Sequence, residues 1–334
     1  MTTRWGILAT GKIAHSFARD LALVPDAELV AVGSRRLEGA QAFAAEHGGT
    51  AYGSYEALVA DPDVDVVYVA SPHALHLEHA RLCFEAGKHV LCEKPLTLDT
   101  ATAEEMVRLA AQHDRFLMEA MWMACHPVVR ELVERLGTGE FGTPRQLHAE
   151  LGFRVDAGPE DRMLDPALGA SALLDMGIYP LTFAHLVLGP AERLTATADL
   201  SERGIDLDIA VAGRYPGGAL ATMTASMTSY SSRRAAIATS TGRIDLDDFH
   251  HPARAVFTPY VEGPGSWVVV PGEPVEVLGR EPVLGQGYGT EAAEVGRCLR
   301  ESLRESPLVP HEQTLTLMRQ MDELRAQVGV EFPG

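Results

Sequence analysis

Basic residues are scarce in this chain of 334 residues. Lys and Arg number 28 against 46 Asp and Glu, which gives a formal net charge of −18 at pH 7. This acidic balance argues against binding of DNA, RNA or an anionic membrane through bulk charge. It is compatible with an anionic cofactor, because a few local amides and arginines outweigh a distant acidic surface. We therefore expect no nucleic-acid partner.

Cysteine and long apolar segments are also sparse. The four cysteines form no CxxC pair and no cluster with zinc spacing, so we expect free, buried or half-buried thiols and no metal site. No apolar run approaches the roughly 20 residues that span a membrane. The first four residues lead directly into a strand without the apolar core of a signal peptide. Together these absences predict a cytoplasmic protein that has no membrane partner.

The first third of the chain alternates apolar strands with helices. Helices are expected at 12–21, 37–47, 76–86 and 100–113, and strands at 5–9, 28–33, 65–70, 88–92 and 116–118. Fully apolar strands separated by helices of this length are typical of a parallel sheet covered on both faces. The pattern predicts an α/β Rossmann domain, a doubly wound parallel sheet, over residues 1–121.

The pattern changes after about residue 122. Polar and apolar residues alternate in several later segments, which predicts a large, mostly antiparallel sheet with unequal faces. A Pro- and Gly-rich stretch at 250–282 is expected to be loop with short strands. Residues 122–334 are thus predicted to form an α+β domain for substrate binding and dimerisation. Its alternating segments are 146–153, 194–200, 208–214 and 219–228, and its expected helices are 127–136, 172–188, 290–304 and 312–327.

A glycine turn joins the first strand to the first helix. Gly11 lets the backbone approach a pyrophosphate, and the free N–H groups at the helix N-terminus would face the phosphates. The usual GxGxxG pattern is degraded, because Ala9 and Ala14 occupy the first and third glycine positions. A tight strand–helix turn without a nucleotide is the alternative. The candidate cofactor-binding residues of this turn are Gly6, Ala9, Thr10, Gly11, Lys12 and Ile13.

The end of the second strand indicates which dinucleotide is bound. NAD sites place Asp or Glu there to bind the ribose 2′-hydroxyl, whereas this chain has Ser34, Arg35 and Arg36. A hydroxyl and two guanidinium groups favour a 2′-phosphate through charge-assisted hydrogen bonds. We therefore predict NADP rather than NAD. The alternative is that both arginines are solvated surface charges.

Two further polar segments follow buried strands. Ser71-Pro72-His73 comes after one strand, with His76 close behind, and Glu93-Lys94-Pro95 comes after the next. The carboxyl ends of parallel strands are where open α/β sheets bind ligands. Farther along the chain, Asp175 and Tyr179 are four residues apart and share one face of a predicted helix.

These motifs resemble the Gfo/Idh/MocA family of NAD(P)-dependent oxidoreductases, and within it the dimeric dihydrodiol dehydrogenases, also described as NADP-dependent D-xylose dehydrogenases. The matching segments extend from Arg4 to Pro310, so the resemblance covers nearly the whole chain. They are Arg4–Ile7, Ala51–Glu56, Leu91–Pro95, Leu117–Trp122, Ala172–Tyr179 and Glu305–Pro310.

The resemblance implies a hydride transfer between nicotinamide and a carbinol carbon, with Lys94 and Tyr179 as the catalytic pair. It also implies a cis Lys94-Pro95 bond. A free phenol with a pKa of about 10 is a poor base, and a neighbouring ammonium would favour its phenolate. By the same resemblance, Trp122, Arg145, Asp175 and Phe153 bind the substrate, and Ser71, Pro72, His73, His76 and Glu93 belong to the cofactor side, where Lys94 can also bond the cofactor ribose.

Each of these assignments has a structural alternative. Tyr179 could be a core residue, Asp175 a helix charge partner, His76 a structural histidine and Arg145 a surface residue. The chain also departs from the family where Gly169-Ala170-Ser171-Ala172 replaces a more glycine-rich run. Ser171 is a candidate N-cap for the helix that follows.

The resemblance implies an NADP-dependent oxidoreductase whose substrate is a sugar, a polyol or a cyclic trans-diol. One alternative keeps the fold and makes the protein a keto-sugar or aldosulose reductase. Another is a non-catalytic NADP-sensing regulator, which the intact Lys94 and Tyr179 disfavour because sensing requires no proton shuttle. The sheet of the second domain predicts a homodimer, with a dimer of dimers as a further possibility.

Overall fold

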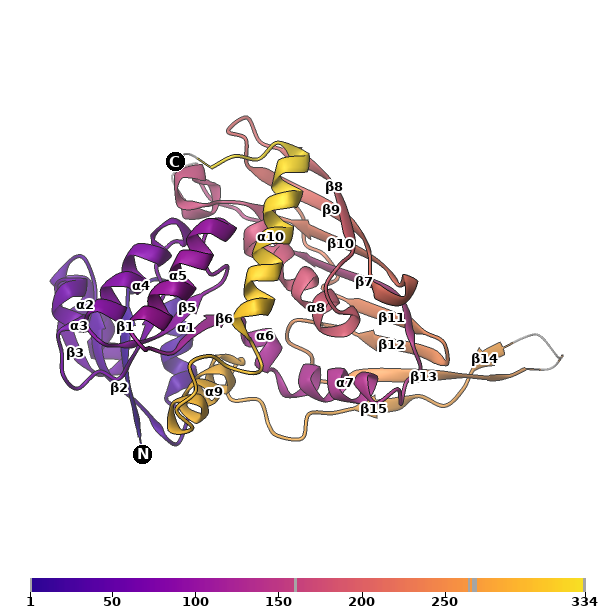
Figure 1. The fold of residues 1–334 in the computed structure, drawn as a ribbon, viewed down its shortest axis with the longest axis horizontal. Helices are drawn as coiled ribbons and strands as arrows, with labels where there is room; N and C mark the ends of the chain where they lie inside the picture. The colour runs from indigo at the N-terminus through magenta and orange to yellow at the C-terminus, as the bar shows by residue number, and fades with distance from the viewer. Residues whose placement is uncertain (1, 159–160, 264, 266–268, 333–334) are drawn as a thin grey trace. The chain divides into compact units, whose positions relative to one another are not determined.

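The computed structural model describes residues 2–158, 161–263, 265 and 269–332. The chain divides into two compact units (Figure 1). Unit 1 consists of residues 1–125, 167–169 and 283–319, and unit 2 of residues 126–166, 170–282 and 320–334.

Unit 1 is built on a six-stranded parallel sheet in the order β3-β2-β1-β4-β5-β6. This order is that of a dinucleotide-binding doubly wound fold, with a reversal of direction between β1 and β4. The strands are largely apolar, and β4 is buried at every residue, because helices cover both faces. They are β1 (Thr3–Leu8), β2 (Ala27–Gly33), β3 (Thr50–Tyr52), β4 (Val66–Val69), β5 (His89–Glu93) and β6 (Leu117–Ala120).

Two groups of helices cover this sheet. Helix α1 contacts α2 and α9, whereas α4 contacts α3 and α5. The core includes Trp5, whose ring lies 5.3 Å from that of Phe17, and Tyr68, which stacks on Phe17 at 3.8 Å. The helices are α1 (Lys12–Leu21), α2 (Leu37–His47), α3 (Tyr55–Val59), α4 (His76–Glu85), α5 (Thr100–Gln112), α6 (Trp122–Cys125) and α9 (Tyr288–Arg300).

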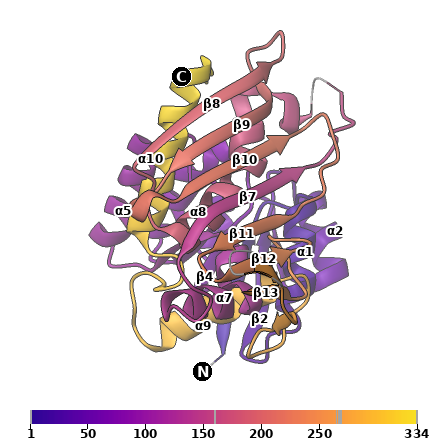
Figure 2. The same ribbon diagram turned by 90° about the vertical axis from the view of Figure 1, so that its right-hand side faces the viewer.

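Unit 2 is built on a nine-stranded mixed sheet (Figure 2). Its path runs β14-β13-β12-β11-β7-β10-β9-β8, and β15 pairs with β13. Only β7 and β10 pair in parallel; the other pairings are antiparallel. The strands are β7 (Pro144–Gly152), β8 (Arg193–Leu200), β9 (Asp206–Arg214), β10 (Leu220–Ser226), β11 (Ala235–Thr239), β12 (Gly242–Leu246), β13 (Ala255–Glu262), β14 (Val269–Pro271) and β15 (Val275–Val277).

One face of this sheet is covered and the other is open. Helix α8 (Ile178–Leu188) packs on β7 and β10, and it lies behind these strands in Figure 2. Helix α7 (Pro127–Gly137) contacts α8 and β15, and α10 (His311–Val328) ends in this unit. Along β10, exposed Leu220, Thr222 and Thr224 alternate with buried residues. The alternation in the sequence thus corresponds to one packed face and one solvent face.

One helical segment of the described residues is long and apolar enough to cross a membrane by length and composition. It is Pro166–Leu188, and 78% of its most apolar window is buried inside the protein. A core helix of a globular domain passes the same test. The four cysteines are buried thiols, as predicted.

The predicted fold class is confirmed, although the sequence analysis missed several elements. Strands β3, β11 and β12 and helix α3 were not predicted, and β13 forms an eight-residue strand where loop with only short strands was expected. The predicted domain division, 1–121 and 122–334, stays a proposal. It differs from the compact units in that residues 283–319 group with unit 1, where α9 contacts α1.

Candidate functional site

The nucleotide turn lies at the point where the order of the parallel sheet reverses. Ala9 follows β1 and has a positive φ of 80°, the conformation that glycine at this position adopts more easily. Gly11 is the N-cap of α1, and a β-carbon placed on it would meet no protein atom within 4 Å. The backbone here is open to a ligand, and the first N–H groups of α1 have no intrahelical acceptor. The turn therefore fits a dinucleotide pyrophosphate.

The end of β2 forms a second open corner beside this turn. A β-carbon on Gly39 in α2 would lie 3.1 Å from Ser34 Oγ and 3.7 Å from Thr10 Oγ1. Ser34 and Thr10, predicted separately, are thus neighbours, and Arg35 and Arg36 are exposed next to them. Gly39 is a part of this corner that the sequence analysis missed.

Ser71 and Arg35 both lie near the paired rings of His79 and Tyr55. The Nδ1 atom of His79 lies 2.8 Å from Ser71 Oγ, and its ring meets the edge of Tyr55 at 4.8 Å. Burial lowers the pKa of His79; Glu78 opposes this effect and the positive charge of Arg35 adds to it. The loops after β2 and β4 therefore flank one surface of unit 1.

His76 is fully buried and holds two loops together. Its Nε2 atom lies 2.8 Å from the carbonyl oxygen of Ser71, and its Nδ1 atom lies 3.1 Å from that of Pro95. Burial lowers the pKa of His76 to about 4, so the ring is neutral at pH 7. His73 is 6% exposed, and its Nδ1 atom lies 3.4 Å from the Gly169 carbonyl. His76 has no exposed surface that a cofactor could contact, and it positions the loops that carry Ser71 and Pro95.

The Glu93-Lys94-Pro95 loop is fixed by two buried carboxyl groups. Tyr68 donates a hydrogen bond to Glu93, and the other carboxyl oxygen of Glu93 accepts the Lys94 amide at 3.2 Å. Glu119 accepts the Leu96 amide at 3.0 Å. The Lys94-Pro95 bond is cis, as the resemblance implied. Lys94 is half-buried at the carboxyl end of β5, beside the nucleotide edge of the sheet.

Glu119 also connects this loop to α10. Its Oε2 atom accepts a hydrogen bond from Thr314 Oγ1 at 2.8 Å. Burial raises the pKa of Glu119 to about 7, against the opposing effects of its hydrogen bonds and of the nearby Lys94 ammonium. Lys94 therefore lies within electrostatic reach of this carboxyl group.

A buried acid that the sequence analysis missed lies close to Glu93. Glu291 in α9 has no exposed surface, and neither of its carboxyl oxygens has a hydrogen-bond partner within the described part of the chain. Burial raises its pKa well above the ordinary value, and the negative charges of Glu93 and Asp20 add to the effect. Burial and these two charges therefore favour the protonated form of Glu291.

Replacing Glu291 with Gln is expected to stabilise the protein increasingly as pH rises. The unfolded carboxyl ionises above about pH 4.5, whereas the raised pKa of the folded one resists ionisation, so the wild-type group favours unfolding at higher pH. We expect a gain of about 1–3 kcal/mol at pH 8 and little at pH 4.5. Urea unfolding at both pH values measures it, with exposed Glu85→Gln as the control. An equal gain at both pH values would refute the assignment.

Trp122 lies at the start of α6 against the first turn of α9. Its ring is 5.3 Å from that of Tyr288, and the residue is 7% exposed. Gly287 has a φ of +114°, and a β-carbon there would lie 2.8 Å from the Trp122 ring. A larger residue at 287 would displace the indole.

Unit 2 brings together Tyr179, His250 and Phe153. The ring of His250 lies 5.4 Å from that of Tyr179 and 6.3 Å from that of Phe153, edge to face in both cases. His250 Nδ1 lies 2.7 Å from Asp248 Oδ1, and Asp248 also pairs with Arg233 at 3.2 Å. Burial opposes ionisation of Asp248, but His250 and Arg233 lower its pKa overall. The phenol thus adjoins a histidine paired with a charged carboxylate.

His250 was missed because it lies in the segment expected to be loop. It is only 8% exposed, and it is separated from Tyr179 by 71 positions in the sequence (250 − 179). Histidine in a Pro- and Gly-rich stretch gives no periodic signal. Only the tertiary structure identifies it as a neighbour of the phenol.

Asp175 is buried in the turn that precedes α8. Its carboxylate lies 3.7 Å from Arg162, and only 6% of its side chain is exposed. Ser171 Oγ accepts the Leu174 amide at 3.1 Å, so the predicted N-cap is confirmed. Asp206 accepts the Leu173 amide at 2.7 Å and fixes the same turn.

Arg145 lies apart from this cluster. It begins β7, whereas Phe153 follows the last residue of that strand, so about eight residues of extended chain, roughly 26 Å, separate them. Its guanidinium lies 3.4 Å from the Gly217 carbonyl and is exposed. The structure places Arg145 away from the other candidate substrate residues of unit 2.

Comparison with known proteins agrees with this geometry. Residues 3–121 match the Gfo/Idh/MocA family model described as an oxidoreductase family with an NAD-binding Rossmann fold, and residues 129–245 match its C-terminal domain. The chain is also 36% identical to the mouse trans-1,2-dihydrobenzene-1,2-diol dehydrogenase over 346 aligned residues, covering 100% of this chain and 99% of that protein. The chain belongs to the Gfo/Idh/MocA family.

Other known proteins are similar along the whole length. The human trans-1,2-dihydrobenzene-1,2-diol dehydrogenase is 35% identical, with 100% of this chain and 99% of that protein covered. A 3-ketoreductase from Actinomadura kijaniata, solved with NADP and TDP-benzene, is 26% identical with full coverage of both chains and a TM-score of 0.84. An aldose-aldose oxidoreductase from Caulobacter crescentus, 22% identical with 98% of each chain covered, shares the fold at a TM-score of 0.85.

Membership in the Gfo/Idh/MocA family makes this protein an oxidoreductase with an NAD-binding Rossmann domain. Its substrate is a small molecule. The nucleotide turn, the Ser34 corner and the loop that carries Lys94 all occur at the carboxyl edge of the sheet in unit 1. This is the edge at which the fold binds its cofactor.

Proposed function

We propose that the protein is an NADP-dependent oxidoreductase that transfers a hydride between nicotinamide and a carbinol carbon of a sugar, a polyol or a cyclic trans-diol. The observation that carries the proposal is the full-length similarity to trans-dihydrodiol dehydrogenases, with Lys94 and Tyr179 both present. A regulator that only senses the cofactor would need neither residue.

In this proposal Tyr179 accepts a proton from the substrate hydroxyl at its phenol oxygen. Lys94 holds the same hydroxyl and favours the charged form of the phenol. His250, paired with Asp248, orients the phenol through its edge-to-face contact. Trp122, Asp175 and Phe153 shape the substrate site; Arg145 has no part in the proposed reaction.

NADP, when bound, supplies the hydride acceptor. Gly11 and the N-terminus of α1 would hold its pyrophosphate, and Ser34, Arg35 and Arg36 its 2′-phosphate. The absence of an acid at the end of β2 supports NADP over NAD, because a carboxylate there would repel the phosphate.

The opposite direction, reduction of a keto-sugar, is the second candidate. It is favoured by the 26% similarity to a 3-ketoreductase solved with NADP and TDP-benzene. The same residues would serve, with Tyr179 donating the proton instead of accepting it.

A cofactor-absorbance screen tests the proposed function. Purified protein with NADP is mixed with pentoses, hexoses and cyclic trans-diols, and protein with NADPH is mixed with the corresponding keto compounds. We expect turnover with at least one vicinal hydroxyl compound or its keto form. The absence of turnover with every compound in both directions would contradict the proposal.

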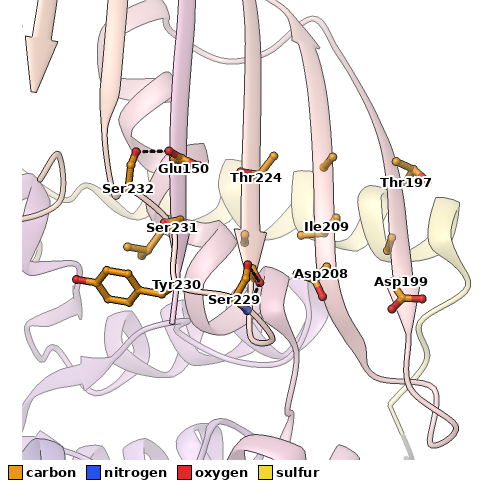
Figure 3. Close-up of a pocket in the computed structure, with 15 residues that line it drawn as sticks. Glu150, Thr197, Asp199, Asp208, Ile209, Thr224, Ser229, Tyr230, Ser231 and Ser232 are labelled. Carbon is orange, nitrogen blue, oxygen red and sulfur yellow. Dashed lines mark hydrogen bonds between the residues drawn. The ribbon is translucent and has the colours of Figure 1, made fainter. Parts of the chain in front are cut away.

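We also propose that the open sheet face of unit 2 is covered by a second copy of the chain in the cytoplasm. A hollow of about 710 Å³ lies on β7, β8, β9 and β10, with Thr197 and Thr224 among its lining residues (Figure 3). Leu220 on the same face is 53% exposed. Small and apolar residues on a broad sheet favour a two-fold interface.

Light scattering is expected to give a dimer of twice the 36.0 kDa chain mass, or a dimer of dimers. Thr224→Arg places a charge in the centre of the face and is expected to yield monomers, whereas Ala111→Arg on exposed α5 leaves the assembly unchanged. A monomer at every concentration of the parent protein would refute the proposed interface.

A further inference from the structure

Two histidines and a glutamate converge on the surface of unit 1, outside the site described above. His15 is the fourth residue of α1, and Glu46 and His47 end α2. His15 Nδ1 lies 2.8 Å from His47 Nε2. The carboxylate of Glu46 reaches both rings, with Oε2 at 3.3 Å from His15 Nδ1 and Oε1 at 3.3 Å from His47 Nε2. Imidazole nitrogens and a carboxylate are a ligand set that Zn²⁺ accepts.

We propose that His15, Glu46 and His47 form a binding site for a divalent transition-metal ion, with Zn²⁺ as the ion it fits best. Zinc–nitrogen and zinc–oxygen bonds of about 2.0–2.1 Å place tetrahedral neighbours about 3.3 Å apart. The nearest carboxylate oxygen of Glu46 lies 3.3 Å from each ring nitrogen, Oε2 for His15 and Oε1 for His47, and one ligand atom from each residue lies within 4.8 Å of the other two. The two ring nitrogens, at 2.8 Å, need to open by about 0.5 Å. Water would complete the four ligands.

The surroundings of the cluster favour a metal over a simple histidine pair. Phe43 packs against both rings, at 4.5 Å from His15 and 4.6 Å from His47, and gives the site an apolar floor. A neutral imidazole is the form that binds a metal.

The ligands also need no large rearrangement to release their lone pairs. In the absence of metal, one of the two facing nitrogens carries the proton of their hydrogen bond. A metal requires both lone pairs, so that ring changes its tautomer on binding. Glu46 is 54% exposed and gives the ion a path from solvent.

The site would join the two helices whose N-termini border the nucleotide turn and the Ser34 corner. His15 is three residues into the helix that begins at Lys12, and its amide donates to the Gly11 carbonyl at 3.3 Å. A metal here would fix α1 against α2, and the stabilisation follows the binding free energy. No local pattern marks this site, because 30 residues lie between His15 and Glu46.

The experiment uses tag-free full-length protein stripped with a chelator. Calorimetric titration with Zn²⁺ is expected to show one bound ion per chain with a dissociation constant at or below about 10 μM. Excess Zn²⁺ is expected to raise Tm by a few degrees. Replacement with Co²⁺ should give the visible absorption bands of a four-coordinate site.

Two variants of proposed ligands and one control variant test the location of the site. His15→Gln and Glu46→Gln are each expected to weaken Zn²⁺ binding at least tenfold and to abolish the rise in Tm. Glu46 is exposed, so its variant should fold as the parent does in chelator. Glu38→Gln on the exposed side of α2 is the matched control and should bind Zn²⁺ like the parent. The buried thiols do not compete, because burial raises the pKa of Cys83 and Cys92.

Two outcomes would overturn the proposal. One is parent protein that binds no Zn²⁺ below about 0.1 mM, which would leave only a hydrogen-bonded histidine pair. The other is undiminished binding of one ion in both His15→Gln and Glu46→Gln, which would place the ion elsewhere. Neither outcome bears on the proposed oxidoreductase activity.

Discussion

Tyr179→Phe is expected to slow hydride transfer by about 10²–10⁴-fold. The substitution removes only the phenol oxygen, which accepts the substrate proton in the proposed reaction. The ring would keep its contact with His250, so folding and NADP affinity should be unchanged. Single-turnover hydride transfer with saturating cofactor measures the effect without interference from product release.

Two comparison variants sharpen this test. Tyr260→Phe removes a phenol from exposed β13 and should react like the parent protein. Lys94→Ala should reduce both the rate and the affinity for NADP, because its ammonium is proposed to contact the cofactor and the substrate. A Tyr179→Phe rate within a few-fold of the parent would remove the phenol from the mechanism and leave Lys94 as the acid–base group.

Ser34→Asp combined with Arg35→Ala is expected to reverse the cofactor preference from NADP to NAD. Each lost charge-assisted contact to the 2′-phosphate costs about 1.5–3 kcal/mol, and the new carboxylate would repel the phosphate and accept the ribose hydroxyl. Ser34 lies beside Thr10 and Gly39 at the proposed 2′-phosphate corner. A carboxylate at position 34 would therefore face the same corner, which supports this prediction.

Titration of both variant and parent with NADP(H) and NAD(H) measures the preference. Arg254→Ala, at an exposed arginine of unit 2, is the control and should leave it unchanged. Equal affinity of the parent protein for both cofactors would contradict the assignment of Ser34, Arg35 and Arg36.

Periodicity in the sequence was sufficient to predict the architecture. The ends of α1 and α2 were predicted to the residue, because apolar positions and flanking Gly11 and Gly48 mark them. Short elements were missed: β3 has three residues, too few for a repeat, and β11 and β12 have only five residues each.

Some features of the candidate site could be predicted because they belong to sequence motifs. Residues that only tertiary contacts bring together could not be predicted. Lys94 and the cis bond before Pro95 followed from the resemblance, and the cap at Ser171 followed from residue type. Glu291 and His250 could not be found, because their partners Glu93 and Tyr179 are distant in the sequence. Desolvation and ring packing depend on the folded environment and leave no local pattern.

The most direct test of the proposed reaction is isotope transfer. The best substrate from the absorbance screen is deuterated at its reacting carbinol carbon and incubated with NADP, and the reduced cofactor is analysed by mass spectrometry and NMR. The account predicts one deuterium on the nicotinamide ring of the product and a slower single turnover. Reduced cofactor without deuterium would contradict a direct hydride transfer from the carbinol carbon.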